Sequence, residues 1–129
     1  MSAALLAKHH DVVVLEDHAE SGTPLQCTGL VSPDVVRMSG VKPTVLNSFS
    51  KLNVHFPDGF VYSIDCKSER AVLLDRSGLD RQLAESAMDA GAEFLYSERC
   101  RSCKISYDSM NIVTESGKEL DSQIVIGAD

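Results

Sequence analysis

Glu16 has clear potential for chemistry, because it directly follows a short apolar run over residues 12–15. A run of this length that is rich in β-branched residues predicts a buried strand. A carboxylate at the carboxyl end of a buried parallel strand can accept hydrogen bonds from the two hydroxyl groups of a nucleotide ribose. Glu16 is therefore a candidate nucleotide-binding residue, although an acid after an apolar strand is also common at solvated strand ends.

The cysteines form the second group of residues that could do chemistry. Cys100 and Cys103 lie three residues apart, a spacing found in metal and redox sites. In a predicted strand, residues three apart point to opposite faces of the sheet, and a structural zinc site needs four ligands. The sequence therefore predicts no metal site. Cys27 is the one cysteine with a functional interpretation, and packing is an equal alternative for it.

A framework of strands and helices must position these residues. The end of a helix over residues 2–8 leads directly into the strand at 12–15, which is typical of the second half of a βαβ unit. Apolar residues at helical spacing predict a long helix over 79–90, with Leu79, Leu83 and Ala87 on its buried face. The other predicted elements are a loop over 17–32, a short helix over 32–39 that begins at Ser32-Pro33, a hairpin over 45–64 that turns at Asp58-Gly59, and strands over 71–74, 93–96, 99–107, 111–114 and 123–126.

Composition restricts the possible partners. The net charge of −7 and the absence of a run of basic residues argue against nucleic acid and against an anionic membrane surface. No apolar stretch approaches the roughly 18 residues of a membrane-spanning helix, and no signal-peptide pattern is present. Four cysteines without an export signal favour a reducing, cytoplasmic setting.

Four motifs follow one another along the chain in a recognisable order. They are the strand ending in Glu16, the segment Gly22-Thr23-Pro24-Leu25-Gln26-Cys27, the segment from Asp75-Arg76 to Leu83, and Gly127-Ala128-Asp129. In this order and spacing they resemble the FAD-binding domain of the geranylgeranyl reductase family, within the larger group that includes para-hydroxybenzoate hydroxylase. The resemblance covers nearly the whole chain. The cysteine loop and the Asp-Arg helix start are its specific elements.

The resemblance implies roles for individual residues. Glu16 would bind the adenosine ribose of FAD, and Cys27 with the backbone of Thr28 to Leu30 would pass beside the flavin ring. Arg76 would reach the ribityl chain or the pyrophosphate, because a guanidinium fork suits phosphate geometry. Cys100 would lie beside the adenine and bond it through its backbone.

The resemblance also implies a fold and partners. The expected fold is α/β: residues 1–129 form a single, partial Rossmann-like FAD-binding domain with parallel strands and one long helix, and the hairpin at 45–64 belongs to a substrate-side layer. The expected partners are an isoprenoid lipid substrate and an electron donor, and the expected location is the cytoplasm or the periphery of a membrane. The flavin would supply the hydride chemistry.

The sequence departs from the family pattern in one important respect. It contains no Gly-x-Gly-x-x-Gly turn, which lies about 20 residues before the ribose-binding acid in such domains. We therefore expect a fragment that does not retain FAD alone and that tends to self-associate through exposed apolar surface. Two other functions stay open: a flavin-dependent aromatic monooxygenase, against which the cysteine loop argues, and a non-catalytic remnant or partner-binding domain.

Overall fold

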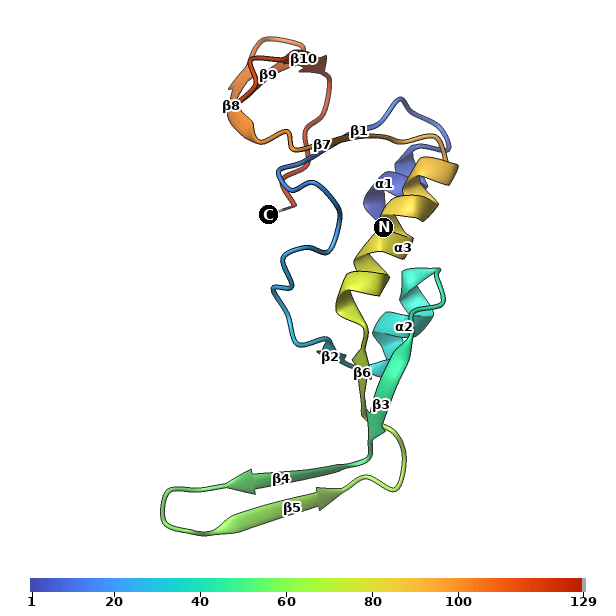
Figure 1. Ribbon diagram of the computed structural model, residues 1–129, viewed down its shortest axis with the longest axis vertical. Helices are drawn as coiled ribbons and strands as arrows, with labels where there is room; N and C mark the ends of the chain where they lie inside the picture. The colour runs from blue at the N-terminus through green and yellow to red at the C-terminus, as the bar shows by residue number, and fades with distance from the viewer. Residues whose placement is uncertain (129) are drawn as a thin grey trace.

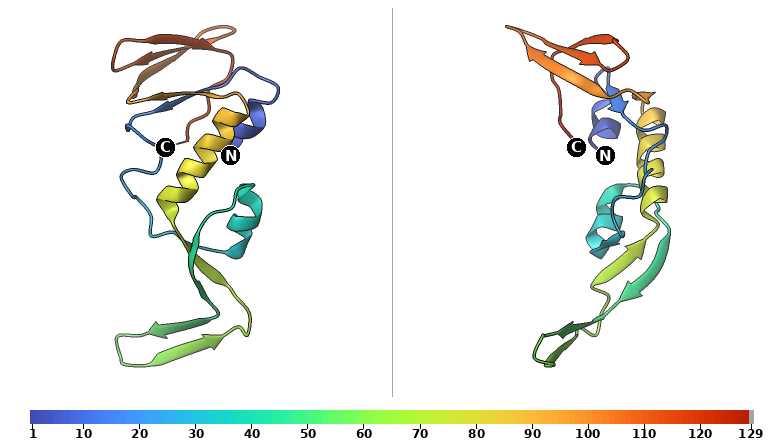
Figure 2. Two further views of the ribbon diagram at one scale, coloured as in Figure 1. Left: turned by 45° about the vertical axis from the view of Figure 1, so that its right-hand side comes forward. Right: turned by 60° about the vertical axis from the view of Figure 1, so that its left-hand side comes forward.

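The computed structural model describes residues 1–128 and shows an elongated molecule built around one long helix. In Figure 1, α3 (Arg76–Asp89) runs along the middle, a small antiparallel sheet lies at one end, and a two-stranded hairpin projects at the other. The views in Figure 2 show the same order of parts. The mixed α/β architecture expected from the sequence is confirmed. The predicted helix residues Leu79 and Ala87 are buried, and Leu83 packs partly buried against the core.

The parallel part of the fold consists of β1 (Val13–Glu16) and β7 (Glu93–Tyr96), which pair in register from Val13↔Glu93 to Glu16↔Tyr96. The short helix α1 (Ser2–Leu6) leads into β1 and packs against α3. The strand at β1 was expected to be buried, but Val13 is 46% exposed and the rest of β1 is half-buried. The reason is that β7 is its only strand neighbour among residues 1–128.

The main core lies where the N-terminal end of α3 packs against a second sheet. This sheet has the order β2 (Leu30–Val31), β6 (Ala71–Leu74), β3 (Val45–Phe49), and both of its pairings are antiparallel. Burial alternates along β6, so that Val72 and Leu74 face Leu79 of α3 in one apolar cluster. The helix α2 (Pro33–Ser39) contributes the partly buried Val36 to this cluster.

The helix α2 begins where it was expected, with Ser32 as N-cap and Pro33 as its first residue, although the side chain of Ser32 makes no capping hydrogen bond. The long helix was expected to begin at Leu79, whereas α3 begins at Arg76. The reason is that Oδ1 of Asp75 accepts a hydrogen bond at 3.0 Å from the backbone N–H of Gly78, which caps the first turn.

The predicted hairpin is present, but with narrower bounds. It consists of β4 (Lys51–His55) and β5 (Val61–Asp65), which pair from Lys51↔Asp65 to His55↔Val61 around a turn at Asp58-Gly59. Residues 45–49 were expected to belong to this hairpin, but they form β3 and pair with β6 instead. Figure 1 shows the hairpin projecting on the same side of β3 and β6 as β2.

The small sheet at the other end has the order β10 (Glu119–Ser122), β9 (Met110–Thr114), β8 (Cys100–Ile105). The prediction of a strand at 123–126 is wrong. The strand in this part of the chain is β10, which pairs with β9 directly after the turn at Ser116-Gly117. The last residue, Asp129, lies outside the described residues, as does its place in the Gly127-Ala128-Asp129 motif.

The expectation that Cys100 and Cys103 point to opposite faces is also wrong. Cys100 pairs with Thr114 and Cys103 pairs with Ile112, with a register shift between Cys100 and Ser102. Paired residues share a face of an antiparallel sheet, and Thr114 and Ile112, two residues apart on β9, share one face. The extra residue of the shift, Arg101, cancels the alternation.

None of the helices within residues 1–128 has the length and apolar character needed to span a membrane.

Candidate functional site

Glu16 is the last residue of β1, and its carboxylate is held by the chain that follows it. Oε1 of Glu16 accepts a hydrogen bond from the backbone N–H of His18 at 3.0 Å and lies 2.8 Å from Nδ1 of the same residue. That Nδ1 atom is also 2.7 Å from Oδ1 of Asp17. Each of these three side chains places one potential metal-ligand atom within 4.8 Å of the others, an arrangement that the hydrogen bonds explain. The second oxygen of Glu16, Oε2, has no partner among residues 1–128.

The segment after β7 lies alongside the end of β1. The backbone N–H of Glu98 donates to the carbonyl of Glu16, and that of Ser97 donates to the carbonyl of His18, both at 2.9 Å. Arg99 adds a contact of 3.9 Å between its Nε and Oδ2 of Asp17. Cys100 follows directly, so the structure brings the predicted adenine-side residue next to the segment that flanks Glu16.

Glu98 itself is a structural carboxylate. Hydrogen bonds from the hydroxyls of Thr114 and then Ser116, and the charge of Lys118, lower the pKa of Glu98 from its ordinary value. The hydroxyl of Ser116 lies 2.9 and 2.8 Å from the two carboxylate oxygens. Glu98 therefore ties the end of β7 to the turn between β9 and β10.

The loop over 17–29 runs along one side of α3, and two glycines fix its path. Gly22 and Gly29 both have a φ of +82°, which disfavours other residues. A Cβ atom on Gly22 would lie 2.8 Å from the carbonyl oxygen of Ser77, and one on Gly29 would lie 2.5 Å from that of Leu74. Ser77 Oγ also donates to the carbonyl of Gly22 at 2.7 Å. The loop is thus held against the start of α3 by main-chain contact.

Cys27, Thr28 and Leu30 are exposed at the end of this loop. The sulfur of Cys27 accepts a hydrogen bond from the backbone N–H of Gly29 at 3.5 Å. The backbone N–H groups of Cys27 and Thr28 have no acceptor among residues 1–128. This turn therefore presents main-chain donors and one thiol on the surface, next to Arg76, whose Cβ is 3.4 Å from the position of a Cβ on Gly29.

Arg76 has a partner that the sequence analysis missed. Its Nε lies 3.0 Å from Oδ2 of Asp80, and its Nη2 lies 2.8 Å from Oδ1, which is a two-point contact one turn along α3. The guanidinium is therefore oriented by Asp80 at the first position of the helix. The Asp-Arg-x-x-x-Asp spacing was the signal that could have indicated this pair.

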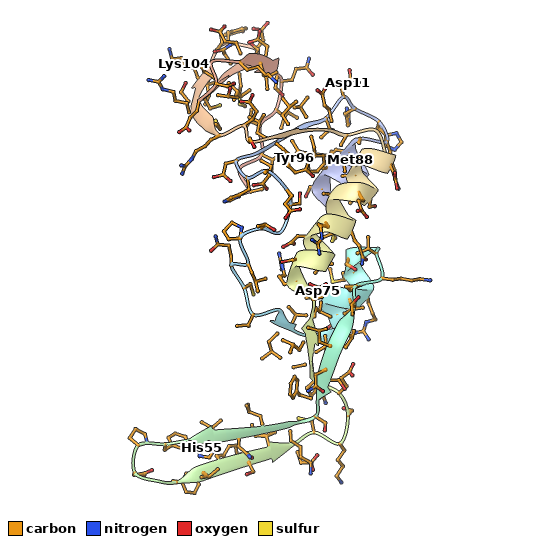
Figure 3. All side chains as sticks on the ribbon, in the orientation of Figure 1. Asp11, His55, Asp75, Met88, Tyr96 and Lys104 are labelled. Carbon is orange, nitrogen blue, oxygen red and sulfur yellow. The ribbon has the colours of Figure 1, made fainter. Side chains whose placement is uncertain are left out.

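The structure thus gathers the predicted residues into two groups. Glu16 and Cys100 lie near the carboxyl ends of β1 and β7, whereas residues 27–30 and Arg76 lie near the start of α3. The loop over 17–29 connects the groups on one side of α3 (Figure 1), and Figure 3 shows Tyr96 and Asp75 toward the two ends of this stretch. Because the two groups of residues lie apart along the same side of α3, a ligand that contacts both must be long and extended.

Comparison with curated proteins gives the first indication of kinship. The chain is 34% identical over 87 residues to digeranylgeranylglycerophospholipid reductase 2 of Methanothermobacter thermautotrophicus, which covers 65% of the chain and 23% of the relative. It is 27% identical to the protein of the same name from Methanosphaera stadtmanae, over 92% of the chain and 33% of the relative. The chain therefore spans about a quarter to a third of the length of these relatives. No protein-family model matches the sequence.

Solved structures share the fold at low sequence identity. A geranylgeranyl bacteriochlorophyll reductase-like protein from Thermoplasma acidophilum superimposes with a TM-score of 0.77 at 18% identity, over 93% of the chain and 33% of that protein. A mutant of the halogenase PltM, crystallised in complex with FAD, superimposes with a TM-score of 0.68 at 15% identity, over 95% of the chain and 30% of that protein.

The chain has a mixed α/β fold that these FAD-binding oxidoreductase fold proteins share. Within this class, the curated relatives and the Thermoplasma structure confirm the resemblance drawn from the motifs. The comparisons support a fragment that is similar to the geranylgeranyl reductase family.

Proposed function

We propose that the chain is the part of an FAD-dependent isoprenoid-lipid reductase that holds the adenosine ribose at Glu16 and the flavin edge at residues 27–30. The observation that carries the proposal is the free Oε2 of Glu16 at the carboxyl end of a parallel strand. Such an acceptor is what a ribose diol requires. The names of the curated relatives support the lipid substrate and favour a reductase over an aromatic monooxygenase.

The other residues present also fit FAD. The free backbone N–H groups of Cys27 and Thr28 are donors suited to the polar edge of a flavin ring, and Cys100 lies beside the segment that flanks Glu16. Arg76, oriented by Asp80, would present its remaining guanidinium N–H groups toward the ribityl chain or the pyrophosphate. FAD, when bound, supplies the hydride chemistry, and the side chains of this segment bind and orient it.

The reductase activity belongs to the whole protein that carries this segment. Its substrate would be a prenyl lipid, and a separate electron donor would reduce the flavin. A substrate of this class resides in a membrane, so the protein would meet it at a membrane surface. We expect the 129-residue chain by itself to bind FAD only weakly, because it contains no Gly-x-Gly-x-x-Gly turn for the pyrophosphate.

The cofactor assignment can be tested on the chain as it stands. Backbone amide shifts in nuclear magnetic resonance spectra would be followed while FAD is added to millimolar concentration, with free riboflavin in a parallel titration. We expect FAD to shift the amides of residues 16–18, 27–30 and 76, and riboflavin to shift only 27–30. An absence of FAD-dependent shifts at these positions, or shifts elsewhere, would show that the proposed site is wrong.

A further inference from the structure

His18 lies two residues beyond the proposed ribose acceptor, and its main chain is held on both sides. Its backbone N–H donates to Oε1 of Glu16 at 3.0 Å, and its carbonyl accepts from the backbone N–H of Ser97 at 2.9 Å. Ser97 directly follows Tyr96, which is labelled in Figure 3 and pairs with Glu16. Because the backbone of His18 is fixed to both strands, only the side-chain torsions are left to place its imidazole ring.

The imidazole ring of His18 lies between two carboxylates. Its Nδ1 atom is 2.8 Å from Oε1 of Glu16 and 2.7 Å from Oδ1 of Asp17. An ionised carboxylate only accepts hydrogen bonds, and the hydrogen bonds of an imidazole decide which of its nitrogens carries the proton. The geometry therefore requires a proton on Nδ1, whether the ring is neutral or charged.

This proton opposes the repulsion between the two acids. One carboxylate oxygen of Glu16 and one of Asp17 lie within 4.8 Å of each other, a distance at which like charges repel. The shared Nδ1–H attracts both oxygens, and Arg99 lies 3.9 Å from the other oxygen of Asp17. Without the ring, the carboxylate of Glu16 would turn away from Asp17. The ring thus decides that Oε1 faces His18 and that Oε2 is available to a ligand.

We infer that His18 is a positioning residue for the nucleotide site: its Nδ1–H fixes the carboxylate of Glu16 so that Oε2 meets the ribose hydroxyls. The inference rests on the proposed function and deepens it, because it names the residue that makes the ribose contact selective. His18 acts through Glu16 and needs no contact with the ribose itself. Asparagine carries an N–H donor at the place of Nδ1, so it should replace histidine in this role, whereas leucine should not.

The first test measures the proton on the ring of the 129-residue chain without a ligand. Nuclear magnetic resonance of nitrogen-15-labelled histidine rings distinguishes a protonated Nδ1 from a protonated Nε2, and His18→Asn identifies the signal of His18 by removing it. His55, exposed on the hairpin (Figure 3), serves as the reference. We expect the proton of the neutral ring on Nδ1 in His18. A neutral ring protonated only on Nε2 would overturn the inference.

The second test measures ribose selectivity. The probes are ADP and 2′-deoxy-ADP, with riboflavin in a parallel titration, and the readout is backbone amide shifts of the 129-residue chain. The variants are His18→Leu, which removes the donor, His18→Asn, which keeps a donor, and His55→Leu as the matched loss of an exposed histidine. The side chain of His18 is 42% exposed, so the variants should fold, which circular dichroism checks.

We expect the wild type, His55→Leu and His18→Asn to bind ADP about fivefold more tightly than 2′-deoxy-ADP, because only ADP offers both ribose hydroxyls to a charged acceptor. In His18→Leu the two affinities should become nearly equal, and riboflavin binding should be the same in all variants. The inference is overturned if His18→Leu keeps the selectivity of the wild type, or if His18→Asn loses it. A wild type that binds both nucleotides equally would reject the ribose site at Glu16 and the proposed function with it, which no result on the variants can imitate.

Discussion

The Nδ1 atom of His18 lies 2.8 Å from Oε1 of Glu16 and 2.7 Å from Oδ1 of Asp17. Together with the backbone N–H of His18, this ring occupies one oxygen of Glu16 and leaves the other available. A carboxylate oriented in this way loses less conformational freedom when it binds a ligand than one that rotates freely. The strand end thus supplies a fixed acceptor and not merely a surface charge.

Removing the charge of Glu16 should weaken FAD binding in the full-length protein that carries this segment. Losing a charged hydrogen-bond partner typically costs roughly 1.5–3 kcal/mol, and about 1.4 kcal/mol corresponds to a tenfold change in affinity. Glu16→Gln keeps the shape and one acceptor, so we expect the FAD dissociation constant to rise about tenfold. Fluorescence titration would measure it, with Asp17→Asn as the matched loss of charge. If Glu16→Gln binds FAD like the wild type, the ribose assignment is wrong.

Arg76→Lys should affect both folding and flavin chemistry. Lysine keeps the charge but cannot reproduce the two-point contact of Arg76 with Asp80, with N···O distances of 2.8 and 3.0 Å. We expect a loss of about 0.5 kcal/mol in the free energy of unfolding. In the full-length protein the rate of flavin reoxidation in a single turnover should fall as well as the affinity. Arg81→Lys, on the next turn of α3, is the control; an equal effect there would mean that the change acts through the helix alone.

Gly29→Ala tests the close main-chain contact that holds the loop. Both Gly29, with a φ of +82°, and Gly59, with a φ of +86°, have left-handed backbones, but a Cβ on Gly59 would meet nothing within 4 Å. Gly59→Ala should therefore cost only the conformational term, about 1 kcal/mol. Gly29→Ala adds a Cβ 2.5 Å from the carbonyl oxygen of Leu74, so it should destabilise by at least about 2 kcal/mol more. Urea unfolding measures both, and similar values would contradict the packing of the loop against β6.

The pKa of Glu98 gives the stability of the chain a dependence on pH. Hydroxyl groups of Thr114 and Ser116 lower that pKa from its ordinary value of 4.5, so the folded state favours the carboxylate. The resulting stabilisation is complete above the unfolded pKa and is lost as the pH falls through the folded pKa. The stability advantage of the wild type over Glu98→Gln should therefore shrink below about pH 4.5. Unfolding midpoints measured across this pH range would show the trend, with Glu115→Gln as the matched loss of charge because the carboxylate of Glu115 has no hydrogen-bond partner among residues 1–128.

Much of the local structure could be predicted because it depends on short-range patterns. The alternation around Asp58-Gly59 and the helical spacing from Leu79 to Ala87 each predict one element, and both elements are present. The strand with which a segment pairs cannot be predicted from such short-range patterns. Residues 45–49 were expected to belong to the hairpin, but they pair with β6, which lies more than twenty residues further along the chain. No local pattern specifies such a pairing.

The site shows the same division. Glu16 and Arg76 were proposed from their places after a strand and at a helix start. Their partners differ: the Asp-Arg-x-x-x-Asp spacing could have indicated Asp80, whereas His18 could not be distinguished from an ordinary surface residue. The apolar run at 123–126 favoured a strand, but the more polar segment Glu119–Ser122 forms it, because the turn at Ser116-Gly117 sets the register with β9. Hydrophobicity predicts burial better than it predicts hydrogen-bond register.

The thiols of Cys100 and Cys103 should not bind zinc at stoichiometric level. The register shift in β8 places both cysteines on the same face of the sheet, whereas regular alternation would place them on opposite faces. They nevertheless supply only two ligands, and no cluster of three metal-ligating side chains among residues 1–128 includes either cysteine. A structural zinc site needs four ligands. Protein purified without a chelator should contain well below one zinc per chain by elemental analysis, and Cys100→Ser should leave that content unchanged. One zinc per chain, lost on this substitution, would establish a metal site at the bulge.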